Sequence, residues 1–534
     1  MKIGAYIEAT VDDFINVDRS EELLVVRNPA YSYNRRFGKR IDHSIPEFLT
    51  YFTIEGDRVR VPRNFPREEF VIGAFDDAVI TYSEGGRKTD VKFRGTLRDY
   101  QGKFIGGLKL DKHNDLLLEM PTGHGKTVCG TYVAMLRKTP TLILVPTNFL
   151  ARQFYSAITT HFDAKVKLFS SKDKEIELEY DEDFAILSFD LLDSRFDKLS
   201  DKFIKYFGCV MMDEAHRIGA DSYHPLIYKM PAKYRIALTA TFRRTDGADK
   251  VLQYDFGHHY KMENHFPRPK VYGLNTGLSV DFVCPRYYTP QKIKGKAQPR
   301  ALYPNTEILV QFLESENIDY NVTETCVEYS VDLEPKVKEK ITKGLLSASR
   351  GGKIIAANNK AVKYPSYSIM DNYIAEREFR RAKVEKLIKA CLEADRKILV
   401  LSKRKESLKR YYEKFKDLTN CILIVGGTDK ISEEKWDDIN KNCRIVFGID
   451  KLAKEGLDIP DLDCLIFEHP MKDTEQPLGR INRLAKYKKK HPIAFFLLDN
   501  AVAYRAVFRA SRSFTLRNST MEGEIKWNEF KKIL

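Results

Sequence analysis

The chain has 534 residues, 43% of them hydrophobic, which is more than one ordinary core accommodates, so several domains are expected. Lys and Arg number 89 against 75 Asp and Glu, a formal net charge of +14 that favours a polyanionic partner. No apolar run reaches the ~20 residues of a membrane span, and the N-terminus lacks the apolar core of a secretory signal. We therefore expect a soluble, cytoplasmic protein. The eight cysteines form no Cys-x-x-Cys pair, which argues against a zinc ribbon.

Residues 1–90 differ in composition from the rest of the chain. They contain turn signals at Asn28-Pro29 and Gly85-Gly86, many aromatic residues and a basic cluster at 31–40. This pattern predicts a small, separate N-terminal accessory domain, with the capacity to bind a duplex or a junction.

Residues 91–264 alternate short apolar runs with longer helical stretches. Near-continuous apolar strands between helices indicate a parallel sheet that is covered on both faces. The predicted strands are LLLEM at 116–120, TLILV at 141–145, FAILS at 184–188, CVMM at 209–212 and RIALT at 235–239.

The segment MPTGHGKT at 120–127 follows the first of these strands. Gly123 and Gly125 would let the backbone turn its N–H groups toward phosphates, next to a helix N-terminus that favours anions. Lys126 would reach the β- and γ-phosphates of ATP, and Thr127 would ligate Mg²⁺. The first position of the strict motif is Met120, so a plain glycine turn before a helix is the alternative. His124 is expected to face solvent.

The segment DEAH at 213–216 follows the buried run CVMM. Asp213 would hold Mg²⁺, usually through water. Glu214 would orient and deprotonate the attacking water. An isolated Asp-Glu pair is more often a solvated turn, but its place after a buried strand and downstream of a phosphate loop favours catalysis.

Residues 265–375 are expected to be a connection and insertion. Within them, Arg286, Tyr287 and Tyr288 belong to a stretch that mixes basic and tyrosine residues. Base stacking combined with phosphate pairing uses such a mixture, and a solvated loop is the alternative.

Residues 376–534 repeat the alternation seen in the first α/β region. The predicted strands are ILVLS at 398–402, CILIV at 421–425, RIVFGI at 444–449, DCLIF at 463–467 and IAFFLL at 493–498. A second α/β domain with a parallel sheet is therefore expected.

The order of four motifs resembles that of superfamily 2 DNA helicases: MPTGHGKT, DEAH, LTAT at 238–241 and QPLGRINR at 476–483. Within this superfamily, LTATFRRTDG at 238–247 and KEGLDIP at 454–460 are similar to the XPB-like group and to phage branch-migration helicases of the UvsW type. The resemblance implies two tandem RecA-like domains with ATP and Mg²⁺ as cofactors.

The resemblance also assigns roles to single residues. Gln101 in LRDYQ would read adenine, Gly456 and Asp458 would couple nucleotide state to the second domain, and Thr239 and Thr241 would link the ATP site to nucleic acid. The nucleic-acid contacts that it implies follow the second strand of the first domain and the first strand of the second: Thr147, Asn148, Arg152, Ser402, Lys403 and Arg404.

The segment QPLGRINR predicts a helix that starts near Pro477, which suits a first turn. Gln476, Arg480 and Arg483 would share one face at i, i+4 and i+7. An arginine there could stabilise the transferring phosphoryl group as an arginine finger. A basic surface helix is the alternative, more for Arg483 than for Arg480.

These patterns predict an ATP-dependent DNA helicase or translocase that remodels forked or branched DNA in replication, recombination or repair. Two alternatives remain open at this point. One is an RNA helicase, and the other is an ATP-gated scaffold that binds junctions without separating strands.

Overall fold

The computed structural model describes two compact units, Met1–His265 and Phe266–Leu534. The described residues are 2–10, 24–28, 31, 47–66, 78–170, 173, 175–215, 224–240, 242, 249–266, 268–281, 314, 320–322, 327–329, 371, 374–425, 438–439, 441–450, 459, 461–471, 474–482, 490–501, 519–527 and 529–534.

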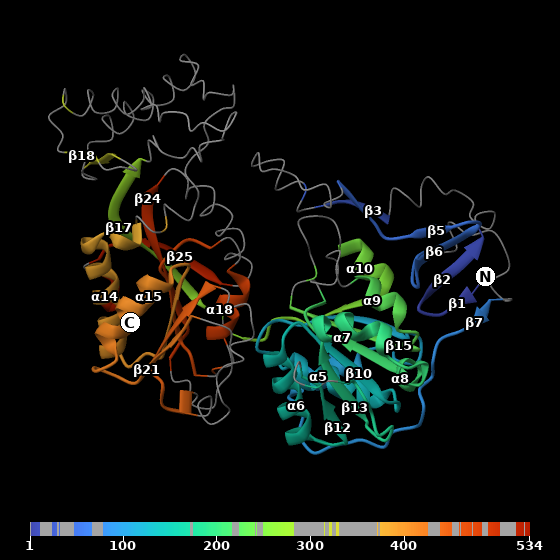
Figure 1. The fold of residues 1–534 in the computed structure, drawn as a ribbon. Helices are drawn as coiled ribbons and strands as arrows, with labels where there is room; N and C mark the ends of the chain where they lie inside the picture. Colours follow the sequence, from blue (N-terminus) through green and yellow to red (C-terminus); the bar gives the residue numbers. More distant parts are fainter. Residues whose placement is uncertain are drawn as a thin grey trace, which may run out of the picture. The chain divides into compact units, whose positions relative to one another are not determined.

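A parallel sheet forms the centre of the first unit (Figure 1), in the order β12-β13-β10-β14-β15-β9-β16. Every neighbouring pair in this order is parallel. The strands are β9 (Asp115–Glu119), β10 (Thr141–Val145), β12 (Val166–Leu168), β13 (Phe184–Ser188), β14 (Cys209–Met212), β15 (Tyr234–Thr239) and β16 (His258–Lys261). Each predicted strand of this region is therefore present.

Both faces of this sheet are covered, which explains why its strands are apolar throughout. In β10, Leu142 and Leu144 pack on one face while Ile143 and Val145 pack on the other. The first face is covered by α7 (Phe189–Arg195), α8 (Asp201–Tyr206), α9 (His224–Lys229) and α10 (Asp249–Phe256). The second face is covered by α4 (Asp99–Gly106), α5 (Lys126–Leu136) and α6 (Asn148–His161).

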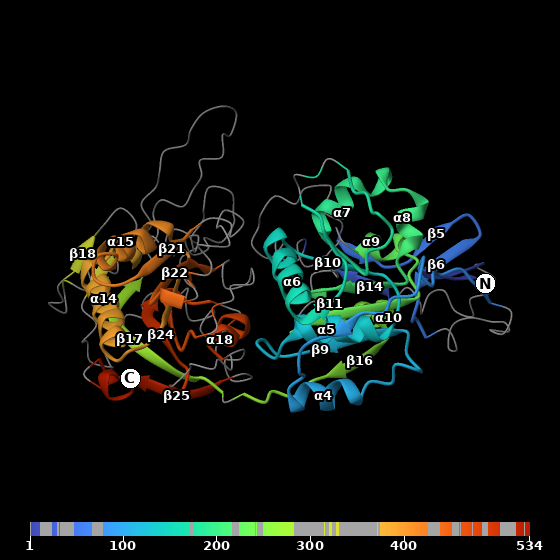
Figure 2. The same ribbon diagram turned by 90° about the horizontal axis from the view of Figure 1, so that it is seen from below.

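The N-terminal residues form a second sheet in the order β5-β6-β2-β1-β7. Its strands are β1 (Lys2–Ile3), β2 (Tyr6–Thr10), β5 (Thr53–Glu55), β6 (Arg58–Pro62) and β7 (Val79–Ile80). Two smaller pairs join β3 (Val25–Arg27) to β4 (Phe48–Thr50), and β8 (Lys92–Phe93) to β11 (Phe162–Asp163). Ile7, Val59 and Val61 of this sheet share a core with Val251 of α10, which lies beside β6 (Figure 2).

Two buried arginines attach the N-terminal sheet to the α/β core. The Arg63 Nε donates to Asp115 Oδ2 at 2.9 Å, and the Arg63 Nη1 donates to the Ala232 carbonyl at 2.7 Å. From the other side, Arg235 of β15 donates to the carbonyls of Ala5 and Ile227. The segment that was expected to be a separate accessory domain is thus part of the first compact unit.

The second unit is built on a sheet in the order β18-β19-β17-β24-β23-β20-β22-β21, with β25 also paired to β17. Its strands are β17 (Lys270–Asp281), β18 (Tyr320–Val322), β19 (Val327–Tyr329), β20 (Ile398–Ser402), β21 (Cys421–Ile424), β22 (Ile445–Ile449), β23 (Cys464–Phe467), β24 (Ile493–Ala501) and β25 (Thr520–Ile525). The five predicted strands are present and pair in parallel. β17 falls in the range expected to be a connection, yet it pairs in parallel along β24.

Helices cover both faces of this sheet as well. α14 (Glu378–Glu393) and α15 (Lys405–Phe415) pack on one face, and α18 (Glu475–Ile481) packs on the other. The prediction of two tandem α/β domains with parallel sheets is confirmed. None of the helices among the described residues has both the length and the apolar character needed to cross a membrane.

A charged network lies inside the second unit. Arg380 of α14 has no exposed side-chain surface, and its Nε donates to Asp499 Oδ1 at 2.9 Å. Its Nη1 lies 3.4 Å from Glu468 Oε1, which also accepts a hydrogen bond from the Tyr411 hydroxyl at 2.8 Å. The network therefore ties α14 and α15 to the carboxyl ends of β23 and β24.

Candidate functional site

The phosphate-loop and DEAH segments meet at the carboxyl edge of the first sheet. Lys126 begins α5 after β9, and Asp213 follows β14. Only β15 separates these two strands in the sheet, so their following residues come together. The Lys126 Nζ lies 3.0 Å from Glu214 Oε1 and 3.6 Å from Asp213 Oδ1. The carboxyl edge of a parallel sheet is the usual place of a ligand in this class of fold.

The loop before α5 has a shape that requires glycine. Gly123 and Gly125 have φ angles of 85° and 83°, in the left-handed region. A Cβ on Gly125 would also lie 2.5 Å from Gln101 Nε2. Gly125 is the N-cap of α5, so the loop leads directly into a helix N-terminus, where backbone N–H groups favour an anion.

Gln101 of α4 is buried beside this loop. Its Oε1 accepts a hydrogen bond from the Arg98 N–H at 3.0 Å, and its Nε2 donates to the His124 carbonyl at 2.9 Å. The residue expected to read adenine is therefore in contact with the phosphate-binding loop.

His124 corrects an expectation, because its side chain is fully buried and does not face solvent. Its ring packs edge-on against Tyr100, with the centroids 5.5 Å apart. The Nε2 accepts a hydrogen bond from the His265 N–H at 3.0 Å, and Nδ1 lies 3.3 Å from the Thr122 carbonyl. Burial lowers the pKa of His124 to about 4, so the ring is neutral and fits a tautomer that donates from Nδ1.

The Asp213 carboxylate is suited to a hard cation. The side chain is buried, and burial raises the pKa of Asp213 although the nearby Lys126 charge opposes this. Its Oδ1 accepts no hydrogen bond from the part of the chain that the structure describes. Thr127 lies in the first turn of α5. Carboxylate and hydroxyl oxygens are the donors that Mg²⁺ prefers, so Asp213 and Thr127 fit this ion.

Glu214 has an uncommon backbone conformation. Its φ is 51°, in the left-handed region that residues with a side chain seldom adopt. Such strain is concentrated at functional sites, and here it accompanies the side-chain contact with Lys126.

The LTAT segment reaches the same edge. Thr239, the last residue of β15, accepts a backbone hydrogen bond from the Met120 N–H at 2.8 Å, which connects this strand end to the start of the phosphate loop. Thr241 lies outside the described residues.

The expected nucleic-acid contacts of the first unit follow β10 at this carboxyl edge. Thr147 is the N-cap of α6, and its Oγ1 accepts a hydrogen bond from the Leu150 N–H at 3.3 Å. Asn148 and Arg152 lie on the first turns of α6. The structure thus groups the three residues at one helix N-terminus.

The counterpart residues of the second unit follow β20. The Ser402 Oγ accepts a hydrogen bond from the Arg404 N–H at 3.0 Å and lies 3.2 Å from His469 Nδ1. Asp371 Oδ2 lies 3.8 Å from the Lys403 Nζ and 3.6 Å from the Arg404 Nη2. Sequence reasoning missed Asp371 and His469, since neither belongs to a recognisable motif.

The QPLGRINR segment forms α18, with Pro477 in its first turn as predicted. Gln476 and Arg480 are 9% and 8% exposed, so neither is a freely solvated surface residue. The helix ends at Ile481, and Arg483 lies outside the described residues. Other expected site residues also fall outside the described residues: Gly456, Asp458, Arg286, Tyr287 and Tyr288.

Two family models match the chain, one within each unit. Residues 94–244 match the model of the "Type III restriction enzyme, res subunit", and residues 382–488 match the "Helicase conserved C-terminal domain". The first model contains the phosphate loop and the DEAH segment, and the second begins within α14 and extends past α18.

Curated relatives include viral and archaeal proteins. A "Putative ATP-dependent RNA helicase" of Acanthamoeba polyphaga mimivirus is 26% identical over 266 residues, which are 49% of this chain and 48% of the relative. A "Putative helicase" of Invertebrate iridescent virus 3 is 30% identical over 194 residues, 36% of this chain and 59% of the relative. The "DNA 3'-5' translocase XPB2" of Sulfurisphaera tokodaii is 27% identical over 161 residues, 30% of this chain and 34% of the relative.

Each match spans less than two thirds of the relative's own length. The similarity therefore leaves substrate and partners open. The two family models and these relatives agree with the motif order and with the lysine–carboxylate cluster at the sheet edge. These findings support assignment of the chain to the superfamily 2 helicases.

Proposed function

We propose that this chain is an ATP-driven DNA translocase or helicase that remodels forked or branched DNA. One observation carries the ATPase part of the proposal: Lys126 contacts Glu214 at 3.0 Å and Asp213 at 3.6 Å, at the carboxyl edge of a parallel sheet. A cation aimed at phosphates and two carboxylates beside it are the groups that nucleoside triphosphate hydrolysis needs.

Each residue has a distinct task in this proposal. The loop backbone around Gly123 and Gly125 and the Lys126 ammonium bind the phosphates. Asp213 and Thr127 would hold Mg²⁺, which would supply positive charge near the phosphate oxygens. Glu214 accepts the proton of the attacking water. Because Lys126 contacts Glu214 in this structure, Lys126 must exchange that carboxylate for phosphate oxygens before Glu214 can act as a base.

Residues of the second unit complete the proposal. Arg480 stabilises the charge of the transferring phosphoryl group, and Gln476 on the same helix supports it. A requirement for groups from both units would make hydrolysis depend on a change in their arrangement, which is how ATP cleavage produces movement. Contacts with the nucleic-acid phosphates, which carry no sequence information, would come from Thr147, Arg152, Lys403 and Arg404.

Two observations bear on whether the motor acts on DNA or on RNA. Similarity to the archaeal DNA translocase, and the LTATFRRTDG segment, favour DNA. The mimiviral relative is named as an RNA helicase, which makes RNA the second candidate. The net charge of +14 fits either polyanion.

The test compares ATP hydrolysis by the full chain on single-stranded DNA, duplex DNA, a fork, a four-way junction and single-stranded RNA. We expect the fork or junction to stimulate hydrolysis most. Glu214→Gln should reduce the turnover number by roughly 100-fold or more, while the exposed control Glu263→Gln should leave it unchanged.

Strand displacement measured on the same substrates separates the remaining candidates. Stronger stimulation by RNA would replace the DNA proposal with an RNA motor. Unchanged junction processing in Glu214→Gln would favour an ATP-gated scaffold. Absence of stimulation by any nucleic acid would refute the proposal as a whole.

A further inference from the structure

A pocket lies at the edge of the first sheet opposite the phosphate loop. It has a volume of about 290 Å³. Asp115 is the first residue of β9 and His258 the first of β16, so both mark the amino edge of the parallel sheet. Lys126 follows the other end of β9. The pocket is therefore separate from the phosphate loop by the full length of a strand.

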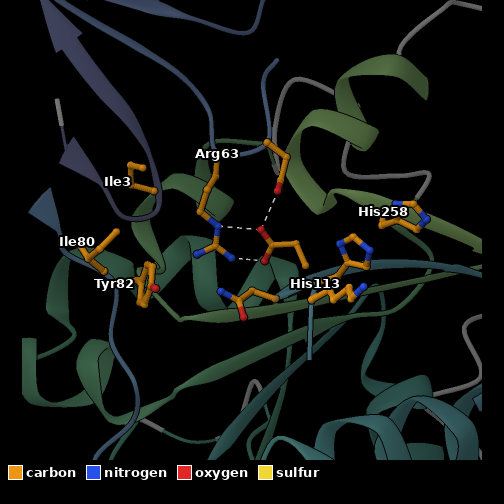
Figure 3. Close-up of a pocket in the computed structure, with 10 residues that line it drawn as sticks. Ile3, Arg63, Ile80, Tyr82, His113 and His258 are labelled. Atoms are coloured by element: carbon orange, nitrogen blue, oxygen red, sulfur yellow. Dashed lines mark hydrogen bonds and ion pairs between the residues drawn. The ribbon is translucent and has the colours of Figure 1, made fainter. Parts of the chain in front are cut away.

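The N-terminal sheet forms one wall of this pocket. Figure 3 shows Ile3, Ile80 and Tyr82 on one side of Arg63, with His113 and His258 on the other. Ile80 is 52% exposed. An isoleucine open to solvent beside a half-buried tyrosine leaves apolar surface uncovered, and burying it under a flat apolar group would be favourable.

The floor of the pocket consists of buried residues whose opposite charges are paired with each other. Arg63 and Asp115 are each 5% exposed and form an ion pair, and the Asn64 Nδ2 donates to Asp115 Oδ2 at 2.8 Å. The charge of Arg63 is therefore already satisfied. This floor holds its shape through buried, hydrogen-bonded groups that cross between the two sheets.

The opposite wall carries polar groups and positive charge. The rings of His113 and His258 stack with centroids 4.4 Å apart and planes 9° apart. Lys112 and Asn114, on either side of His113, are exposed at the rim. Lys233 lies 5.9 Å from the centre of the Tyr82 ring, but its ammonium is paired with Glu84 at 2.8 Å, so Lys112 is the cation that this wall offers.

A ligand that matches these walls has a flat apolar body and an anionic group. The body would lie against Ile80 and Tyr82, and the anion would contact Lys112. Aromatic stacking combined with a lysine–phosphate contact is the usual way in which proteins hold a nucleotide without reading its sequence.

We propose that this pocket binds one nucleoside phosphate unit, with the base against Tyr82 and the phosphate at Lys112. Two sources share this chemistry: a nucleotide within a nucleic-acid strand, and a free mononucleotide. The inference rests on the proposed function for the first source only. It makes the N-terminal sheet a nucleic-acid contact of the first unit, distinct from the residues that follow β10 and β20.

The test is photocrosslinking of the full chain to a single-stranded oligonucleotide that carries 5-iodouracil, followed by mass spectrometry of the crosslinked peptides. A parallel arm uses free 5-iodo-deoxyuridine monophosphate. We expect a crosslink in the peptide that contains Tyr82. Crosslinking there by the oligonucleotide assigns the strand as the source, and crosslinking there by the monophosphate alone assigns the free nucleotide.

Affinity measurements on variants give a second readout. Lys112→Glu should weaken binding of the assigned probe by about fivefold or more, with a shallower salt dependence. Tyr82→Ala should weaken it by about tenfold, whereas Tyr82→Phe, which keeps the ring, should not. Lys198→Glu, an exposed charge change in the 3-10 helix Phe196–Lys198, is the matched control. Basal ATP hydrolysis should stay unchanged in all four variants.

Different experimental results would refute the pocket proposal and the proposed function. Oligonucleotide crosslinks elsewhere in the chain, with none at the Tyr82 peptide from either probe, would overturn the pocket and leave the motor intact. No crosslink anywhere and no stimulated hydrolysis would overturn both. Equal affinity of Tyr82→Ala and the parent would also overturn the pocket.

Discussion

Replacing Arg380 by methionine is expected to destabilise the second unit strongly. The side chain is fully buried and faces the carboxylates of Asp499 and Glu468, at 2.9 Å and 3.4 Å. Removing one member of a buried ion pair costs about 3–5 kcal/mol, because the remaining charge has lost its partner in a dry interior. Two carboxylates lose their cation here, so we expect the upper part of that range.

A compensating variant tests the electrostatic origin of this cost. Combining Arg380→Met with Glu468→Gln and Asp499→Asn removes all three charges and retains similar volumes. Neutral replacement of a whole buried charge cluster is often close to neutral for stability, so the triple variant should recover most of the loss. Lys386→Met, an exposed change on the same helix, should alter stability by less than about 0.5 kcal/mol.

The assay is urea unfolding of the full chain followed by tryptophan fluorescence. The two tryptophans of the sequence, Trp436 and Trp527, both fall within the second unit, so the signal reports this unit. A loss below about 1 kcal/mol for Arg380→Met would refute the reasoning. A triple variant as unstable as the single one would show that packing, rather than charge, sets the cost.

Three further predictions concern the first unit. The pKa of His124 falls from 6.5 to about 4 on folding. Between these pH values the unfolded chain binds a proton at His124 that the folded chain does not. The free energy of unfolding should therefore drop by about 3 kcal/mol as pH falls from 6.5 to 4. Thermal unfolding across that range should show a flatter profile for His124→Gln. Gly125→Ala should displace Gln101 and strain the loop by about 1–2 kcal/mol, weakening binding of a fluorescent ATP analogue, while Gly102→Ala, with open space around it, should not. Thr147→Ala should lower the free energy of unfolding by about 1 kcal/mol, because it removes the side-chain cap of α6, and Thr147→Ser should restore that stability in thermal unfolding. Nucleic-acid affinity should fall in Thr147→Ala and recover in Thr147→Ser. An affinity that stays low in Thr147→Ser would contradict a role limited to the hydroxyl.

The central strands of both sheets could be predicted because burial on two faces makes them apolar without interruption, whereas β12, β16 and β25 are only partly buried and carry polar residues. β17 could not, because it contains Gly273, Asn275 and Gly277, and its partner β24 lies more than 200 residues further along the chain. A break in register between Asn275 and Ser279 disturbs its pattern further.

The candidate site divides in the same way. The placement of Lys126, Asp213 and Glu214 at one edge of the sheet could be predicted because each follows a recognisable apolar strand. The burial of His124 could not, since it depends on His265 and Tyr100, which the sequence places in unrelated segments. Arg63 lies in a basic run that suggests a solvated surface, and its partner Asp115 is 52 residues away.

The attachment of the N-terminal sheet limits how this protein can be divided. A fragment that starts at residue 94, where the first family model begins, would lose Arg63 and the Ala5 carbonyl. Asp115 and Arg235 would then lose these partners, and Val251 of α10 would lose the core that it shares with Ile7, Val59 and Val61. For deletion mapping and recombinant expression, we therefore expect a fragment bounded by the family model to be less stable than the whole first unit, because strands before that boundary contribute to its core.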